Sequence, residues 1–139
     1  MVARSTANDL SSALIQVLEG EPHQLRTLQT ADHSALLAAA TSLRVPLLVT
    51  RMALASVLRG LEGRTVSPEE AQRWASFVRR GYFGRSGGDP IQPLDIAYEE
   101  ESEDAIVEVV ARLDEIGDAV DGEVSPKEIR ELLQLLADS

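Results

Sequence analysis

The chain has 139 residues and no cysteine, which excludes disulfides, thiolate metal sites and a thiol nucleophile. Its net charge is −10 and 44% of its residues are hydrophobic, a composition typical of a globular protein of one domain. No apolar run reaches the roughly 18 residues that a membrane span requires, and the N-terminus lacks the apolar segment of a secretory signal. We therefore expect a cytoplasmic protein with one domain, residues 1–139, and no membrane contact.

The first segment with helical spacing is NDLSSALIQVLEG. Asn8 or Asp9 is the expected cap, leucines and a valine recur at helical intervals, and Gly20 ends the run. Pro22 is suited to the first position of a short second helix that carries Leu25.

Two further helices are predicted around Pro46. TADHSALLAAATSLRV has a cap at Thr30 or Asp32, and Pro46 breaks or kinks this helix. PLLVTRMALASVLRGLEG follows and is apolar on most sides, which is typical of a helix buried at the centre of a bundle. No pair of alternating strands joined by a hairpin turn is recognisable in the sequence.

A long loop is expected over residues 81–97, because RGYFGRSGGDPIQPLDIAY contains four glycines and two prolines. It joins two helical halves, about 1–80 and 98–139. In the second half, DAIVEVVARLDEIGDAV is amphipathic and a last helix carries Leu132 and Leu136. The predicted fold is all-α, a bundle of about five or six helices with one long Gly/Pro-rich loop.

Two predicted helix starts have nearly the same sequence. Ser67-Pro68-Glu69-Glu70 and Ser125-Pro126-Lys127-Glu128 are both expected to form capping boxes, in which Ser and Glu satisfy helix amides reciprocally. The second copy also resembles half of a calcium loop. However, Gly117 and Ala119 stand where that loop requires carboxylates, so we predict no metal site.

No arrangement of residues predicts catalysis. His23 and His33 have no partner at metal-ligand spacing, no serine lies in a GxSxG sequence, and the glycines of the loop are not followed by Gly-Lys-Ser/Thr. Carboxylate pairs are too common in the acidic segment to indicate an acid and a base. We therefore expect no enzymatic activity and no cofactor.

Aromatic residues and arginines are interleaved in RWASFVRRGYFGR, a composition found in binding hot spots. For Trp74 and Phe77, which are three residues apart, we favour a place in the core, with the arginines neutralising the acidic C-terminal third. For Tyr82 and Phe83, which lie on the Gly-rich loop, a role in binding and a structural role remain open.

Acidic charge is concentrated at the end of the chain. Residues 91–139 hold fifteen Asp and Glu against three Lys and Arg, whereas residues 1–90 hold eight against ten. Such a surface repels nucleic acids and attracts a basic protein, although acidity could also serve solubility alone. The residues predicted to bind a partner are Glu99, Glu100, Glu101, Glu103, Asp104, Glu108, Tyr82 and Phe83.

The segments GRTVSPEEAQRWA and EDAIVEVVARLDEIGDAVDG, followed by a last helix, resemble the small bacterial immunity proteins of the colicin D type. The resemblance covers about residues 60–136. It implies an acidic helical bundle that blocks a basic toxin enzyme. The sequence thus favours a non-catalytic protein-binding module with an acidic C-terminal surface. The alternative is a structural or regulatory homo-oligomer, such as a homodimer, whose apolar central helix is buried between subunits.

Overall fold

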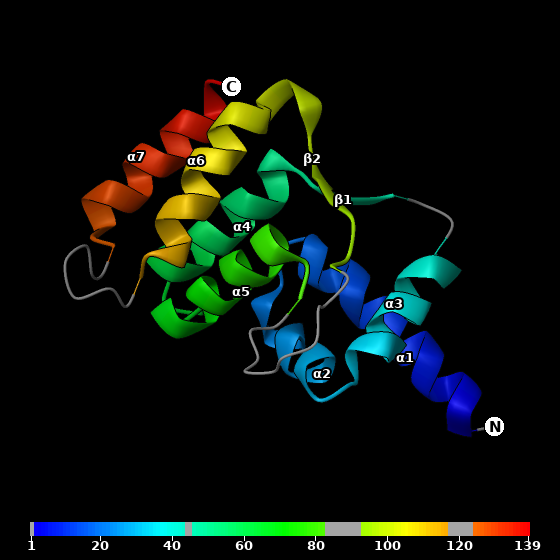
Figure 1. Cartoon of the computed structure of the whole chain (residues 1–139). Helices are drawn as coiled ribbons and strands as arrows, with labels where there is room; N and C mark the ends of the chain where they lie inside the picture. The colour runs from blue at the N-terminus through cyan, green and yellow to red at the C-terminus, as the bar shows by residue number, and fades with distance from the viewer. Residues whose placement is uncertain (1, 44–45, 83–92, 117–123) are drawn as a thin grey trace.

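The computed structural model describes residues 2–43, 46–82, 93–116 and 124–139. Within them lie seven α-helices, two short 3₁₀ turns and two strands (Figure 1). In chain order these are α1 (Val2–Leu18), η1 (Pro22–Gln24), α2 (Leu25–Gln29), α3 (His33–Ser42), β1 (Leu47–Val49), α4 (Arg51–Glu62), α5 (Pro68–Arg80), β2 (Ile96–Tyr98), η2 (Glu100–Ser102), α6 (Glu103–Asp114) and α7 (Pro126–Ala137). The protein is therefore mostly helical, but the all-α prediction is wrong in detail.

The N-terminal helices follow the predicted pattern with one correction. Helix α1 begins at Val2, so Asn8 and Asp9 lie inside the helix and do not cap it. Beyond its end, Gly20 adopts a φ of 98°, a conformation that glycine takes without steric cost. Pro22 opens the turn into α2 as expected, and Asp32 is the N-cap residue of α3.

The two strands were not predicted. The segment after Pro46 was expected to be helical, but Leu47–Val49 forms β1, which pairs in parallel with β2. The register places Leu47 opposite Ile96 and Val49 opposite Tyr98, so the predicted loop 81–97 ends in a strand. Helix α4 begins only after Thr50, whose hydroxyl accepts a hydrogen bond of 3.1 Å from the Ala53 amide.

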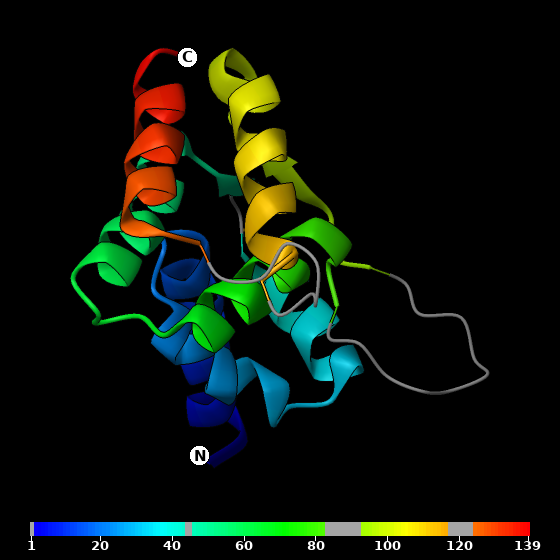
Figure 2. The same cartoon turned by 90° about the vertical axis from the view of Figure 1, so that its left-hand side faces the viewer.

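The C-terminal helices form the other part of the fold. Helix α4 packs beside α7, and α5 packs beside α6. Figures 1 and 2 show α6 and α7 side by side, with the start of α6 and the end of α7 at the same end of the molecule and the N-terminus at the opposite end. Contrary to the prediction, α4 is not buried all round. Its inner face holds Leu54, Val57 and Leu58, whereas Met52 is 74% exposed.

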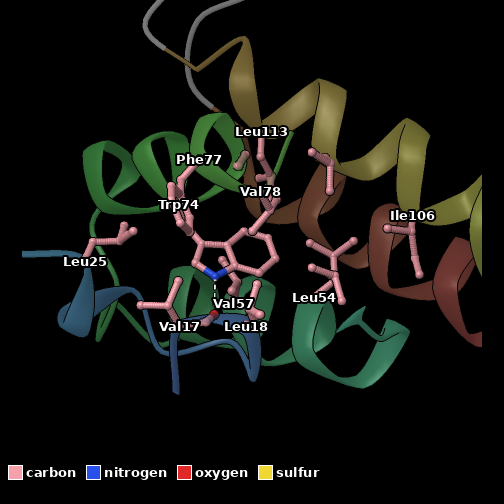
Figure 3. Packing of buried hydrophobic residues seen from close by; sticks show 14 of the residues in the cluster. Val17, Leu18, Leu25, Leu54, Val57, Trp74, Phe77, Val78, Ile106 and Leu113 are labelled. Atoms are coloured by element: carbon pink, nitrogen blue, oxygen red, sulfur yellow. Dashed lines mark hydrogen bonds between the residues drawn. The ribbon is translucent and has the colours of Figure 1, made fainter. Parts of the chain in front are cut away.

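Trp74 lies at the centre of the core, as predicted together with Phe77. Both side chains are fully buried, and the Trp74 indole N–H donates a hydrogen bond of 2.6 Å to the Val17 carbonyl (Figure 3). One hydrophobic cluster includes residues of α1, α4, α5, α6 and α7. Trp74 therefore connects the N-terminal helices to the C-terminal ones through one polar contact in an apolar surrounding.

The two similar helix starts differ in their contacts. Ser67 and Glu70 form a complete capping box, with reciprocal hydrogen bonds of 3.1 and 3.0 Å. Ser125 accepts from the Glu128 amide at 3.1 Å, but the Glu128 carboxylate is taken up by Arg112, at 2.6 and 3.0 Å. The second copy is an N-cap without the reciprocal bond.

No helix in the described ranges is both long enough and apolar enough to cross a membrane.

Candidate functional site

The acidic surface is built where the chain passes from β2 through η2 into α6. The Glu99 amide donates to the Val49 carbonyl at 2.9 Å, which continues the ladder between the strands. The Glu99 carboxylate accepts from the Arg51 amide at 2.9 Å, so it satisfies a free amide at the start of α4. Glu99 is half-buried and has a structural role, unlike the acidic residues that follow it.

The next five acidic residues predicted to bind a partner line one open hollow of about 630 Å³, which the end of α7 completes. The acidic side chains are those of Glu100, Glu101, Glu103, Asp104 and Glu108 from η2 and α6, and α7 and the residues after it contribute Leu135, Asp138 and Ser139. All five are exposed. Local sequence accounts for two of them, because Glu103 and Asp104 lie in the first turn of α6, where negative charge is favourable.

A hydrogen bond between two hydroxyl groups joins the two sides of this hollow, which we call the acidic hollow. The Ser102 hydroxyl lies 2.8 Å from that of Ser139, and Ser102 is only 2% exposed. This contact ties the start of α6 to the end of α7. It brings Asp138 beside acidic residues more than thirty positions earlier in the chain.

Arginines neutralise only part of the acidic C-terminal third. Arg79 binds Asp114 at 2.9 Å, and Arg112 binds Glu128 through two nitrogen atoms. In the described part of the chain, no ion pair involves the six carboxylates of the acidic hollow. Neighbouring carboxylates without cations repel one another, so this surface lowers stability slightly and attracts positive charge.

The predicted aromatic pair is not part of the hollow as the structure describes it. Tyr82 follows α5, is half-buried, and does not line the hollow. Phe83 lies outside the described residues, as do the residues 117–123 that were compared with a calcium loop.

Apolar residues near the hollow were missed by the sequence reasoning. Val107 is 48% exposed on α6, directly before Glu108, and Leu135 lines the hollow from α7. In the sequence they belong to regular amphipathic helices and give no sign of exposure. An exposed apolar side chain among charges is the kind of contact that often anchors a protein interface.

One of the two histidines pairs with a carboxylate. The His23 Nδ1 lies 2.8 Å from a carboxylate oxygen of Glu70, which also completes the capping box. The hydrogen bond from the Ser67 amide, together with His23, lowers the pKa of Glu70 below 4.5, although burial opposes the shift. Among the described residues, no three His, Asp or Glu side chains are grouped as metal ligands.

Comparison with known proteins gives no match to a protein-family model, a curated protein or a solved structure.

Proposed function

We propose that the protein is a non-catalytic binding module that recognises a basic protein through the acidic hollow between α6 and α7. The single observation that carries the proposal is the convergence of six carboxylates on one open surface, none of which is ion-paired within the described residues. Inhibition of a basic toxin enzyme, in the manner of an immunity protein, is its most concrete form.

Physical considerations favour recognition over solubility. A surface that serves solubility alone gains nothing from placing acidic side chains from two separate segments around one hollow, because their repulsion destabilises the folded state. A concave acidic surface with Leu135 inside and Val107 nearby offers a basic partner both charge and apolar contact. Opposite fields would also steer the encounter and raise the association rate.

The test uses a variant in which Glu100, Glu101, Glu103 and Glu108 become Gln and Asp104 becomes Asn. A matched control changes the same number and kinds of exposed acidic residues outside the hollow, namely Glu19, Glu21, Glu62 and Glu69 to Gln and Asp32 to Asn. Each protein serves as bait in a pull-down from the native organism, read by mass spectrometry. We expect one basic protein to be captured by wild type and control but not by the hollow variant.

Rates of association with that protein then show whether the acidic hollow attracts the partner by long-range electrostatics or only contacts it once bound. The wild-type rate should fall as salt increases, because ions screen charges beyond about 8–10 Å. The hollow variant should associate more slowly and depend less on salt, and the control should behave like wild type. Equal rates for all three proteins at both salt levels would leave the acidic hollow without a role in binding.

The alternative function, a homo-oligomer, has one observation in its favour. Met52 is 74% exposed on the outer face of α4, the helix that the alternative expected to be buried between subunits. Light scattering of the purified protein decides this point directly.

A further inference from the structure

A second surface, opposite in charge, lies on the other side of α7. An open groove of about 520 Å³ runs between α4 and α7. Its apolar lining is Met52, Ala55, Leu133, Leu136 and Ala137, and its polar lining is Arg51, Arg59, Arg130 and Gln134. We call this the arginine groove.

The three arginines are placed at both ends of the groove. Arg51 donates to the Ser139 carbonyl at 2.9 Å, so the start of α4 lies beside the end of α7 and the two helices are antiparallel. Arg59 and Arg130, each about two turns from that contact, therefore lie together at the far end. All three side chains are exposed, and none meets an Asp or Glu carboxylate within 4 Å in the part of the chain that the structure describes.

This arrangement is unexpected in an acidic protein. The chain has 23 acidic and 13 basic residues, so we expect an arginine on its surface to lie close to a carboxylate. Elsewhere Arg79 and Arg112 do pair with carboxylates. The three arginines of the groove thus lie beside an apolar floor with no Asp or Glu partner among the described residues, although Arg51 donates to the Ser139 carbonyl. Met52 supplies an exposed, flexible thioether of the kind found on adaptable binding surfaces.

The shape and the charge together identify the occupant. A groove open along two antiparallel helices suits an amphipathic helix that inserts apolar side chains, whereas small-molecule sites enclose most of their ligand. Arg59 comes eight positions after Arg51 on α4, so the groove is roughly 12 Å long between them, about two helical turns. Arginines at both ends call for carboxylates flanking the inserted side chains.

A second copy of this chain fits less well. A symmetric dimer through the groove would bring the same surface of both copies together, so each set of three arginines would face the other. Like charges in such an interface repel one another and disfavour this dimer. We propose that the arginine groove binds an amphipathic helix of another protein, with apolar residues one turn apart and Asp or Glu on either side of them.

The test is a selection from a displayed library of helical peptides of about 16 residues, roughly four turns, randomised along one face of an Ala/Gln frame. The selected pool is measured against wild type and against Arg59→Glu/Arg130→Glu. The control is Arg26→Glu/Arg73→Glu, which makes the same change of net charge in another arginine-lined hollow, one without an exposed methionine. All four arginines are exposed, and thermal melts check that each variant folds.

We expect selected peptides to carry apolar residues at i and i+3 or i+4 flanked by Asp or Glu. They should bind wild type and control equally and the groove variant about tenfold more weakly, with a similar loss for Met52→Asp. A pool without acidic enrichment, or equal binding to the groove variant, would overturn the proposal. So would a dimer in light scattering that Met52→Asp dissociates, because the groove would then be covered by a second copy.

Discussion

The starts of α5 and α7 have nearly the same sequence but different side-chain contacts, so mutations at the two sites should differ in their effect on stability. Ser67→Ala removes the acceptor of the Glu70 amide, and Ser125→Ala removes the acceptor of the Glu128 amide, each at 3.1 Å. An N-cap serine is worth about 1 kcal/mol. For a chain of this length, that corresponds to a loss of about 4 °C in Tm for each variant.

The glutamates should not behave alike. Glu70→Gln keeps a side-chain oxygen that accepts from the Ser67 amide, but it loses the negative charge at the start of α5 and beside His23, so we expect a cost of about 1 kcal/mol. Glu128→Gln removes the carboxylate that binds Arg112 at two nitrogens, and the Arg112 side chain is only 17% exposed. Removing the charge that opposes this largely buried cation should cost about 2 kcal/mol or more.

Acid titration gives a second measurement on Glu70. Its pKa is lowered in the folded state by the Ser67 amide and His23, so the folded protein favours the carboxylate. That contribution is present above pH 4.5 and is lost as the pH falls through the folded pKa. The difference in unfolding free energy between wild type and Glu70→Gln should therefore shrink as the pH falls below 4.5.

The assay is thermal and urea unfolding of all four variants, with Ser56→Ala as a control. Ser56 is exposed in the middle of α4, where alanine should change stability little or raise it slightly. If Glu128→Gln costs no more than Glu70→Gln, the Arg112 contact does not hold α7 in place. If neither serine variant lowers Tm relative to the control, these serines are not N-caps.

The remaining predictions concern the backbone, a tyrosine and calcium. Gly20→Ala should cost about 2–4 kcal/mol in unfolding free energy by urea, because φ is 98° and a Cβ would lie 2.3 Å from the Ala53 carbonyl oxygen. Burial raises the pKa of Tyr98 above 10.0, so wild type should lose stability relative to Tyr98→Phe as the pH rises past that value, measured by urea unfolding in alkaline buffers. Calcium at millimolar levels should give no stoichiometric heat in titration calorimetry, because Gly117 and Ala119 stand where ligands are needed; a sub-millimolar affinity would contradict this.

Sequence reasoning succeeded where the cause is local. Pro22, Gly20 and the serine caps act within a few residues, so their effect on the chain is visible in the sequence. Burial of Trp74 and Phe77 followed from their spacing on one helix face. The start of α1 was missed because a polar stretch with two possible caps, Asn8 and Asp9, hid the helix that precedes it.

Sequence reasoning failed where contacts between segments far apart in the chain determine the structure. Each strand has three residues, which is too few for an alternating pattern to be recognised. The two strands pair in parallel although α4 and α5 separate them in the sequence. The acidic run was visible in the sequence, but its closure by Asp138 and Ser139 depends on how α6 and α7 pack. The arginine groove was invisible, because Arg59 and Arg130 meet only through the antiparallel contact of α4 with α7.

Helix α7 begins at the second of the two similar helix starts and contributes residues to both proposed surfaces. Leu135 faces the acidic hollow, whereas Leu133 and Leu136 face the arginine groove, so one helix divides surfaces of opposite charge. The position of this helix depends on the Ser125 cap and on the contact between Glu128 and Arg112, which sits at its first turn. The contact of Glu128 with Arg112 joins the start of α7 to the end of α6, and the hydrogen bond between Ser102 and Ser139 joins the other ends of the two helices, at the acidic hollow. The net charge of −10 describes neither surface, since the groups that would select a partner are arranged by packing and not by composition.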